Sequence, residues 1–156
     1  MFAVFLCGCS FRPEEHFEFP ATPTKPVIQI HGEHRFMTGT YDVTVMANGH
    51  VDYSNYPLPV ARSELSKEHI SSLLSEMRRT GFWTCDAQSL SNALTDVVVL
   101  DATKITLTAF WMDDKNVITF ERDCLFSPVA KKCKVVLSLR HCVDLIEKEV
   151  LVSRLP

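Results

Sequence analysis

The chain has 156 residues, of which 46% are hydrophobic and 22% are charged, and its formal net charge is -3. These values are typical of one globular domain with a hydrophobic core, and they exclude a disordered chain. The 16 Lys and Arg residues are scattered, which argues against nucleic acid as a partner, and the apolar runs are too short to cross a bilayer.

The chain opens with an apolar run from Met1 to Leu6, followed by Cys7-Gly8-Cys9. This stretch is similar to the bacterial lipobox, at which a secretory signal is cut and the cysteine becomes the lipidated first residue. We therefore expect residues 1–9 to be the remnant of a signal peptide. Cys9 would anchor the protein to the membrane on the periplasmic side, with the outer membrane as the expected site. A buried amino-terminal strand is the alternative interpretation.

Residues 10–26 are rich in proline, with Glu and Thr between the prolines. Because proline fixes φ and lacks a backbone donor, this segment is predicted to be an extended linker outside the core. In a lipoprotein it would hold a single folded domain, residues 27–152, away from the membrane surface. The alternative is a poorly ordered terminus of no consequence.

Two segments with alternating apolar residues, 27–30 and 41–46, predict the first two strands of the domain. The second segment leads through an Ala-Asn-Gly sequence into a return strand at residues 51–53. This pattern predicts a β-hairpin.

The register of this hairpin can be argued from the side chains that would face each other. A two-residue Asn-Gly turn would set apolar residues opposite polar ones. A three-residue loop with Gly49 in the left-handed conformation sets Val45 opposite Val51 and Val43 opposite Tyr53. The second register gives one apolar face, and we predict it.

The clearest predicted helix begins at Ser66 and stops at Gly81. Glu68 lies in its first turn, and Arg78 and Arg79 lie in its last, as the helix dipole favours. The apolar stripe that it would bury consists of Ile70, Leu73, Leu74 and Met77.

Further along, residues 105–110 and 117–121 alternate around a turn at 113–116 and predict a second hairpin. Residues 97–100 are a candidate for an additional strand. A Ser-Pro pair predicts the start of a second helix over residues 127–148. The order of elements favours an α+β fold, with an antiparallel sheet of two hairpins plus additional strands and two helices packed on one face.

The body of the chain, about residues 27–147, resembles a family of bacterial secreted or lipid-anchored proteins, the domain of unknown function 6438 family. The residues that carry the resemblance are Tyr41-Asp42-Val43, Asn48-Gly49, Val51-Asp52-Tyr53, Ser66 to Met77, Gly81-Phe82 and Thr95-Asp96. The family usually has a Cys-x-Gly-x-Cys-Pro element where this chain has residues 36–40, so any function of that element is absent here. The resemblance implies a fold and an envelope address, and no reaction.

Candidate chemistry is sparse. His31-x-x-His34 offers two imidazoles, whereas a zinc site uses three or four protein ligands, so we expect no metal. Asp113-Asp114 is interpreted as a hairpin turn, and Thr95-Asp96 as either a local turn or part of a surface site. The sequence has no Gly-x-Ser-x-Gly, Cys-x-x-Cys or Gly-rich phosphate loop. We therefore expect neither an enzyme nor a bound cofactor.

After signal processing, four cysteines remain, and an even number outside the cytoplasm favours disulfide bonds. In the cytosol they would be expected to stay reduced and buried. A bond between Cys133 and Cys142 is excluded on a continuous helix, because nine residues at ~1.5 Å rise separate them by about 13 Å. Two pairings stay open: Cys124–Cys133 with Cys85–Cys142, or Cys124–Cys142 with Cys85–Cys133. The first is favoured because it closes the shorter local loop.

The leading functional prediction is a non-enzymatic, lipid-anchored periplasmic protein that binds another protein. The most concrete form is an inhibitor or immunity protein against a toxin or a cell-wall hydrolase. The alternative is an envelope assembly or ligand-binding lipoprotein. Predicted loops place five candidate partner-binding residues at the surface: Arg35, Phe36, Tyr56, Trp111 and Asp113. The alternative for Phe36, Tyr56 and Trp111 is that they cap the core.

Overall fold

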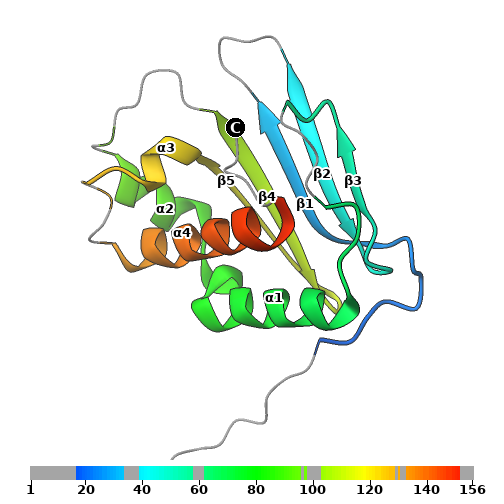
Figure 1. Cartoon of the computed structure of the whole chain (residues 1–156). Coiled ribbons are helices and arrows are strands. Elements are labelled where there is room, and N and C mark those ends of the chain that lie inside the picture. Colours follow the sequence, from blue (N-terminus) through cyan, green and yellow to red (C-terminus); the bar gives the residue numbers. More distant parts are fainter. Residues whose placement is uncertain are drawn as a thin grey trace, which may run out of the picture.

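A five-stranded antiparallel sheet, in the order β3-β2-β1-β4-β5, forms the frame of the molecule, and the helices pack against it (Figure 1). The structure is a computed structural model that describes residues 17–33, 39–57, 62–95, 97, 103–128, 130 and 133–151. The strands are β1 (Pro26–Glu33), β2 (Thr40–Met46), β3 (Val51–Ser54), β4 (Lys104–Trp111) and β5 (Asp114–Glu121). The predicted α+β class is confirmed.

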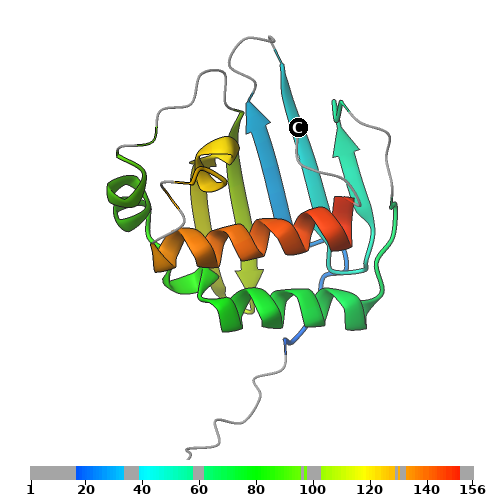
Figure 2. The ribbon, with the colours of Figure 1, turned by 60° about the vertical axis from the view of Figure 1, so that its left-hand side comes forward.

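Two long helices, α1 (Lys67–Thr80) and α4 (Lys134–Ile146), lie side by side across one face of the sheet (Figure 2). The shorter elements are η1 (Phe82–Thr84), α2 (Ala87–Leu94), α3 (Arg122–Leu125) and η3 (Glu147–Leu151), a π-helical turn that continues α4. Alternating residues of the sheet, such as Ile28, Ile30 and Leu107, are buried beneath the helices and form the core with their apolar stripes.

The hairpin of β2 and β3 has the predicted register, with Val43 opposite Tyr53 and Val45 opposite Val51. Gly49 has a φ of 96°, which is the left-handed conformation that the three-residue loop requires. The register prediction is confirmed, and this pairing puts Val51 and Tyr53 of β3 on the same face as the two valines of β2.

Helix α1 also begins and ends as predicted. The Ser66 side chain accepts a hydrogen bond from the backbone N–H of His69, and Gly81 ends the helix in the left-handed conformation with a φ of 94°. All four residues of the predicted stripe are buried.

The turn of the second hairpin is shorter than predicted and lies earlier in the chain. Trp111 pairs with Asp114, so the turn consists of Met112 and Asp113 alone, and Met112 has a positive φ of 53°. Residues 114–116, which the sequence predicted to be part of the turn, form the start of β5. The prediction was wrong because polar residues on an exposed strand resemble turn residues.

The predicted second helix starts too early in the sequence. Helix α4 begins at Lys134 rather than at Ser127, and its N-cap residue is Cys133. The short helices α2 and α3 were not predicted; α2 buries only Leu90, too little for a periodic pattern. Most of the predicted strand at 97–100 lies outside the described residues, and Val97 is not in a strand.

Part of the predicted linker packs against the domain. Phe17 is a buried member of the core, and its ring contacts Trp111. The backbone carbonyls of Pro23 and Lys25 accept hydrogen bonds from the N–H groups of Asn48 and Ala47. The prediction that residues 10–26 lie outside the core was therefore wrong at Phe17, whose side chain is buried, whereas residues 21–25 are exposed.

Candidate functional site

The described helices leave the opposite face of the sheet uncovered (Figures 1 and 2). The strand registers place polar side chains there in rows across all five strands. This outer face includes Gln29, His31, Glu33, Asp42, Thr44, Asp52, Ser54, Lys104, Thr106, Phe110, Lys115, Val117, Thr119 and Glu121, all exposed or half-buried. It offers many hydrogen-bonding groups on a frame that neighbouring strands hold in place.

The half of the outer face formed by β1, β2 and β3 pairs histidines with carboxylates. His31 Nδ1 lies 2.8 Å from Asp42 Oδ1, and His31 Nε2 lies 3.6 Å from Glu33 Oε1. On β3, Asp52 Oδ1 lies 3.0 Å from Nε2 of His50. These side chains are between 40% and 53% exposed, so their charges can act on a docked molecule.

The sequence analysis did not single out these pairs. His50 and Asp52 are two residues apart and so share one face of a strand, a signal that the predicted hairpin already contained. The pair of His31 and Asp42 depends on the register between β1 and β2, which the sequence did not supply.

The half formed by β4 and β5 carries both signs of charge, from Lys104, Lys115 and Glu121, and Lys115 Nζ lies 5.8 Å from the centroid of the Phe110 ring. The hydroxyls of Thr106 and Thr119 lie 3.0 Å apart, and Val117 is 42% exposed, one of the few large exposed apolar side chains. The outer face thus combines an acidic half with a half of mixed charge that also offers hydroxyls and apolar side chains.

The three predicted partner-binding residues that the structure describes do not form one surface. Asp113 is exposed in the turn between β4 and β5. Tyr56 is half-buried, and its ring contacts Tyr41. Arg35 and Phe36 lie outside the described residues.

Trp111 is only 2% exposed and cannot offer its ring to a partner. It packs against Phe17 and Trp83, with the guanidinium of Arg78 4.8 Å from the ring centroid. The interpretation that Trp111 caps the core is therefore correct, and its placement in an exposed loop was wrong. The reason is that β4 extends to Trp111. Every second side chain of this strand faces the core, and Trp111 is one of them.

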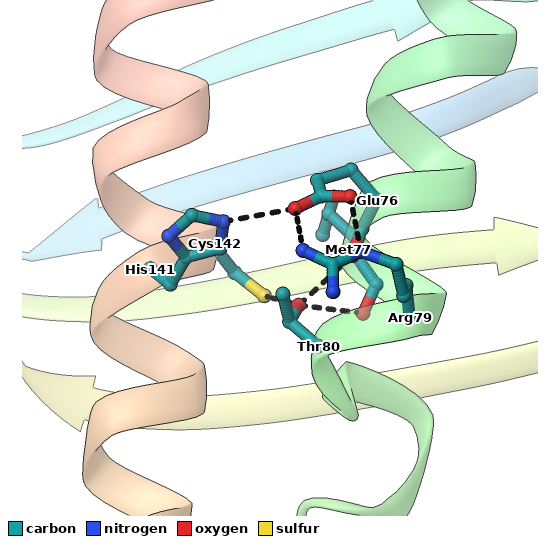
Figure 3. A network of polar contacts seen from close by, with 6 residues as sticks. All are labelled: Glu76, Met77, Arg79, Thr80, His141 and Cys142. Carbon is teal, nitrogen blue, oxygen red and sulfur yellow. Dashed lines mark hydrogen bonds and ion pairs between the residues drawn. The ribbon is translucent and has the colours of Figure 1, made fainter.

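A polar network connects α1 and α4 on the helical side of the sheet (Figure 3). Glu76 accepts a hydrogen bond of 2.7 Å from Arg79 Nε, and His141 Nε2 lies 3.2 Å from Glu76 Oε1. Hydrogen bonds from Arg79, assisted by His141, lower the pKa of the Glu76 carboxyl to about 2. Thr80 Oγ1 lies 3.3 Å from Cys142 Sγ.

The thiols near this network are not activated nucleophiles. Burial raises the pKa of Cys142 to about 11, although its hydrogen bond with Thr80 acts in the opposite direction. Burial, with Asp86 and Cys133 adding to it, raises the pKa of Cys85 to about 11 as well. Because the thiolate is the reactive form, these two cysteines are unsuited to nucleophilic catalysis at neutral pH.

A pocket of about 270 Å³ lies between the end of α1 and the start of α4. Its walls carry hydroxyl and cationic groups together with one thiol, from Arg79, Thr80, Gly81, Thr84, Cys85, Lys134, Val135 and Ser138. Sequence reasoning missed this pocket because its two walls are about fifty residues apart in the chain. Among the described residues, no group of three or more His, Cys, Asp or Glu is placed to hold a metal ion.

A buried ion pair joins α3 to the π-helical turn η3. Arg122 Nε and Nη2 donate to Glu147 Oε1 at 2.9 and 2.8 Å. Tyr41 lies close enough for this pair to act on its hydroxyl, and burial is the main cause that raises the pKa of Tyr41. Gly32 is required here, because a Cβ at that position would overlap the Tyr41 ring.

The remaining predicted features are either local or untested. Thr95 Oγ1 donates to the carbonyl of Ser91 at 3.0 Å, which is the local side-chain-to-backbone bond of the simpler interpretation; Asp96 lies outside the described residues. Cys9 and His34 also lie outside them. No helix in the part of the chain that the structure describes is long and apolar enough to cross a membrane.

Comparison with known proteins gives no match to a family model, to a curated protein or to a solved structure. The resemblance to the bacterial envelope family therefore stays a prediction.

Proposed function

We propose that this chain is a lipid-anchored protein of the bacterial envelope that binds another protein through its outer face, as an inhibitor or immunity protein against a toxin or a cell-wall hydrolase. The observation that supports binding is the uncovered sheet face, whose polar side chains project from all five strands. The envelope address depends on the sequence around Cys9.

The dimensions of the outer face suit a protein partner. Five strands of four to eight residues, spaced by about 4.8 Å and rising ~3.3 Å per residue, give an area of roughly 550 Å². A typical interface buries about 800 Å² on each partner, so the outer face with its adjoining loops is large enough. Because the sheet fixes the backbone, binding would cost little conformational entropy apart from side-chain ordering.

The charges of the outer face favour a basic partner. Glu33, Asp42 and Asp52 lie on adjacent strands, and Lys104, 3.3 Å from Glu33, is the one Lys or Arg that the described contacts place beside them. Complementary charges raise the association rate and exclude wrong partners. An inhibitor needs both properties, because it must capture its target before the target acts.

The test is charge reversal on the outer face. Asp42→Lys with Asp52→Lys should abolish capture of the partner from a detergent-solubilised envelope extract, identified by mass spectrometry, and should abolish inhibition of that purified partner. Asp144→Lys, on the exposed side of α4, is the matched control and should retain both. If the double variant keeps its melting temperature and still inhibits the partner, the outer face is not the binding surface.

A further inference from the structure

The segment from Thr80 to Cys85 lies alongside α4 and runs toward the amino end of that helix. Thr80 Oγ1 lies 3.3 Å from Cys142 Sγ, and a methyl group added at Gly81 would lie 3.9 Å from Ser138 Oγ. Cys85 lines the same pocket as Lys134 and Val135. Each step moves about one turn toward the amino end of α4, so Cys85 faces its first turn.

Cys133 is the N-cap residue of α4 and directly precedes the helical wall of the pocket. Its side chain is half-buried and makes no capping hydrogen bond. The Cys133 thiol is close enough to Cys85 to contribute to the raised pKa of the Cys85 thiol. The contacts along α4 therefore place Cys85 at the first turn of the helix that Cys133 caps, and both thiols are free in the structure.

Cys85 also adds to the raised pKa of Cys142, but Cys142 is the poorer partner for oxidation. It is 0% exposed, and its sulfur is already in a hydrogen bond with Thr80. Disulfide exchange begins with an accessible thiolate that attacks an external disulfide. Cys85 and Cys142 are both buried and both have a pKa of about 11, so a pair of these two would contain no such thiolate.

We propose that Cys85 and Cys133 form a disulfide bond in the mature protein, which fastens the connection between α1 and α2 to the start of α4. Of the two pairings that the sequence left open, this selects the one that contains Cys85–Cys133. Formation of this bond in the cell depends on the oxidising compartment that the proposed function implies. Its formation in the purified protein does not depend on the proposed function.

The chemistry balances with an external disulfide such as oxidised glutathione. The Cys133 thiolate attacks one glutathione sulfur, which forms a mixed disulfide and releases one glutathione thiolate. The Cys85 thiolate then attacks the Cys133 sulfur and releases the second glutathione. The protein loses two protons and two electrons, and one glutathione disulfide becomes two glutathione thiols.

The test is a linkage map of the purified full-length chain after incubation with oxidised and reduced glutathione. Free thiols are alkylated under denaturing conditions, and the protein is digested with trypsin without reduction. Cleavage after Arg79, Lys104, Lys132 and Lys134 places Cys85 and Cys133 on separate peptides. Cuts after Arg122, Lys131, Arg140 and Lys148 separate Cys124 and Cys142 from them and from each other. We expect a linked species that joins residues 80–104 to residues 133–134 and disappears on reduction.

Two variants keep the test decisive. Cys133→Ser should leave Cys85 fully alkylated, and it should fold because serine is a favoured N-cap residue. Cys124→Ser, the matched control, should retain the linked species. Alkylated Cys85 in the wild-type chain, or Cys85 linked to Cys142 or Cys124, would overturn the proposal. No partner or lipid takes part in this experiment, so its failure is distinguishable from failure of the proposed function.

Discussion

Arg122 and Glu147 form an ion pair in which two guanidinium nitrogens donate to one carboxylate oxygen, and their side chains are only 13% and 11% exposed. The pair joins the end of the sheet to the π-helical turn after α4, two regions that are 25 residues apart in the sequence. Each charge is held out of water with the other as its partner, so the pair is most sensitive to the loss of one member.

Removal of one partner should therefore destabilise the fold strongly. We expect Arg122→Ala to lower the free energy of unfolding by about 3–5 kcal/mol, because the Glu147 carboxylate, which is only 11% exposed, would lose the guanidinium that donates to it. Urea unfolding followed by circular dichroism measures this change. Lys104→Ala is the control: its pair with Glu33 is about half exposed and should contribute less than about 1 kcal/mol. Equal losses in the two variants would contradict the assignment of a buried pair.

Gly49 should be the most sensitive glycine of the first hairpin. Its φ of 96° is costly for any side chain, and a Cβ there would overlap the carbonyl oxygen of Leu65. Gly49→Ala should cost at least about 1–2 kcal/mol. At Gly39 a Cβ would have no atom within 4 Å, so Gly39→Ala should be nearly neutral. Thermal unfolding of the two variants and the wild-type chain measures both effects. A neutral Gly49→Ala would refute the three-residue loop.

Glu76 should make stability depend on pH in the acid range. Its folded pKa of about 2 lies below the usual 4.5, so its contribution is present above about pH 4.5 and is lost as the pH falls toward 2. Because the side chain is 30% exposed and Arg79 is 72% exposed, we expect no more than about 1 kcal/mol.

Urea midpoints measured between pH 7 and pH 2 test this dependence. Glu76→Gln should be less stable than the wild-type chain at pH 7 and should converge with it near pH 2. Asp144→Asn, which removes an exposed carboxylate of α4, should show no such convergence. A constant difference between Glu76→Gln and wild type across the range would show that the carboxyl charge is not involved.

The reduced protein should react with alkylating agents in a fixed order. At pH 8 iodoacetamide should label Cys133 before Cys85 and Cys142, because burial protects the last two and raises the pKa of each to about 11. The raised pKa values of Cys85 and Cys142 also make the free energy of unfolding depend on pH. The contribution of these two thiols is complete below about pH 9 and is lost as the pH rises toward 11. Time-resolved mass spectrometry gives the order of labelling. Labelling of Cys142 before Cys133 would contradict this prediction. In urea, where the chain is unfolded, the difference in labelling rate between the cysteines should vanish.

The membrane anchor can be tested independently of binding. Cys9→Ser in the full-length gene should release the protein from the membrane fraction, because the lipidated atom is lost. Immunoblots of fractionated cells measure this, and Cys7→Ser, two residues away, is the control that should stay in the membrane fraction. An unaltered protein found in the soluble cytoplasm would refute the lipobox.

Local patterns predicted local structure well. The register of the first hairpin and the two ends of α1 were correct because each combines an apolar period with a terminal signal, Gly49 in one and Ser66 with Gly81 in the other. The start of α4 was predicted at Ser127, because a Ser-Pro pair is a local helix-start signal. The helix in fact begins at Lys134.

The candidate site depends on contacts between distant segments, which one sequence does not encode in any local period. The pairing of β1 with both β2 and β4 creates the rows of the outer face, and it joins residues up to about eighty positions apart. The burial of Trp111 was missed for a related reason, since Phe17 and Trp83 come from segments that the sequence placed elsewhere.

The burial of Phe17 limits the length of the segment that would connect the domain to the bilayer. If Cys9 carries the lipid, eight peptide steps separate the anchor from the first side chain fixed in the core. Even fully extended, they reach about 28 Å. The folded body would then remain within roughly its own diameter of the lipid headgroups, and it could meet only those molecules that come to the membrane surface.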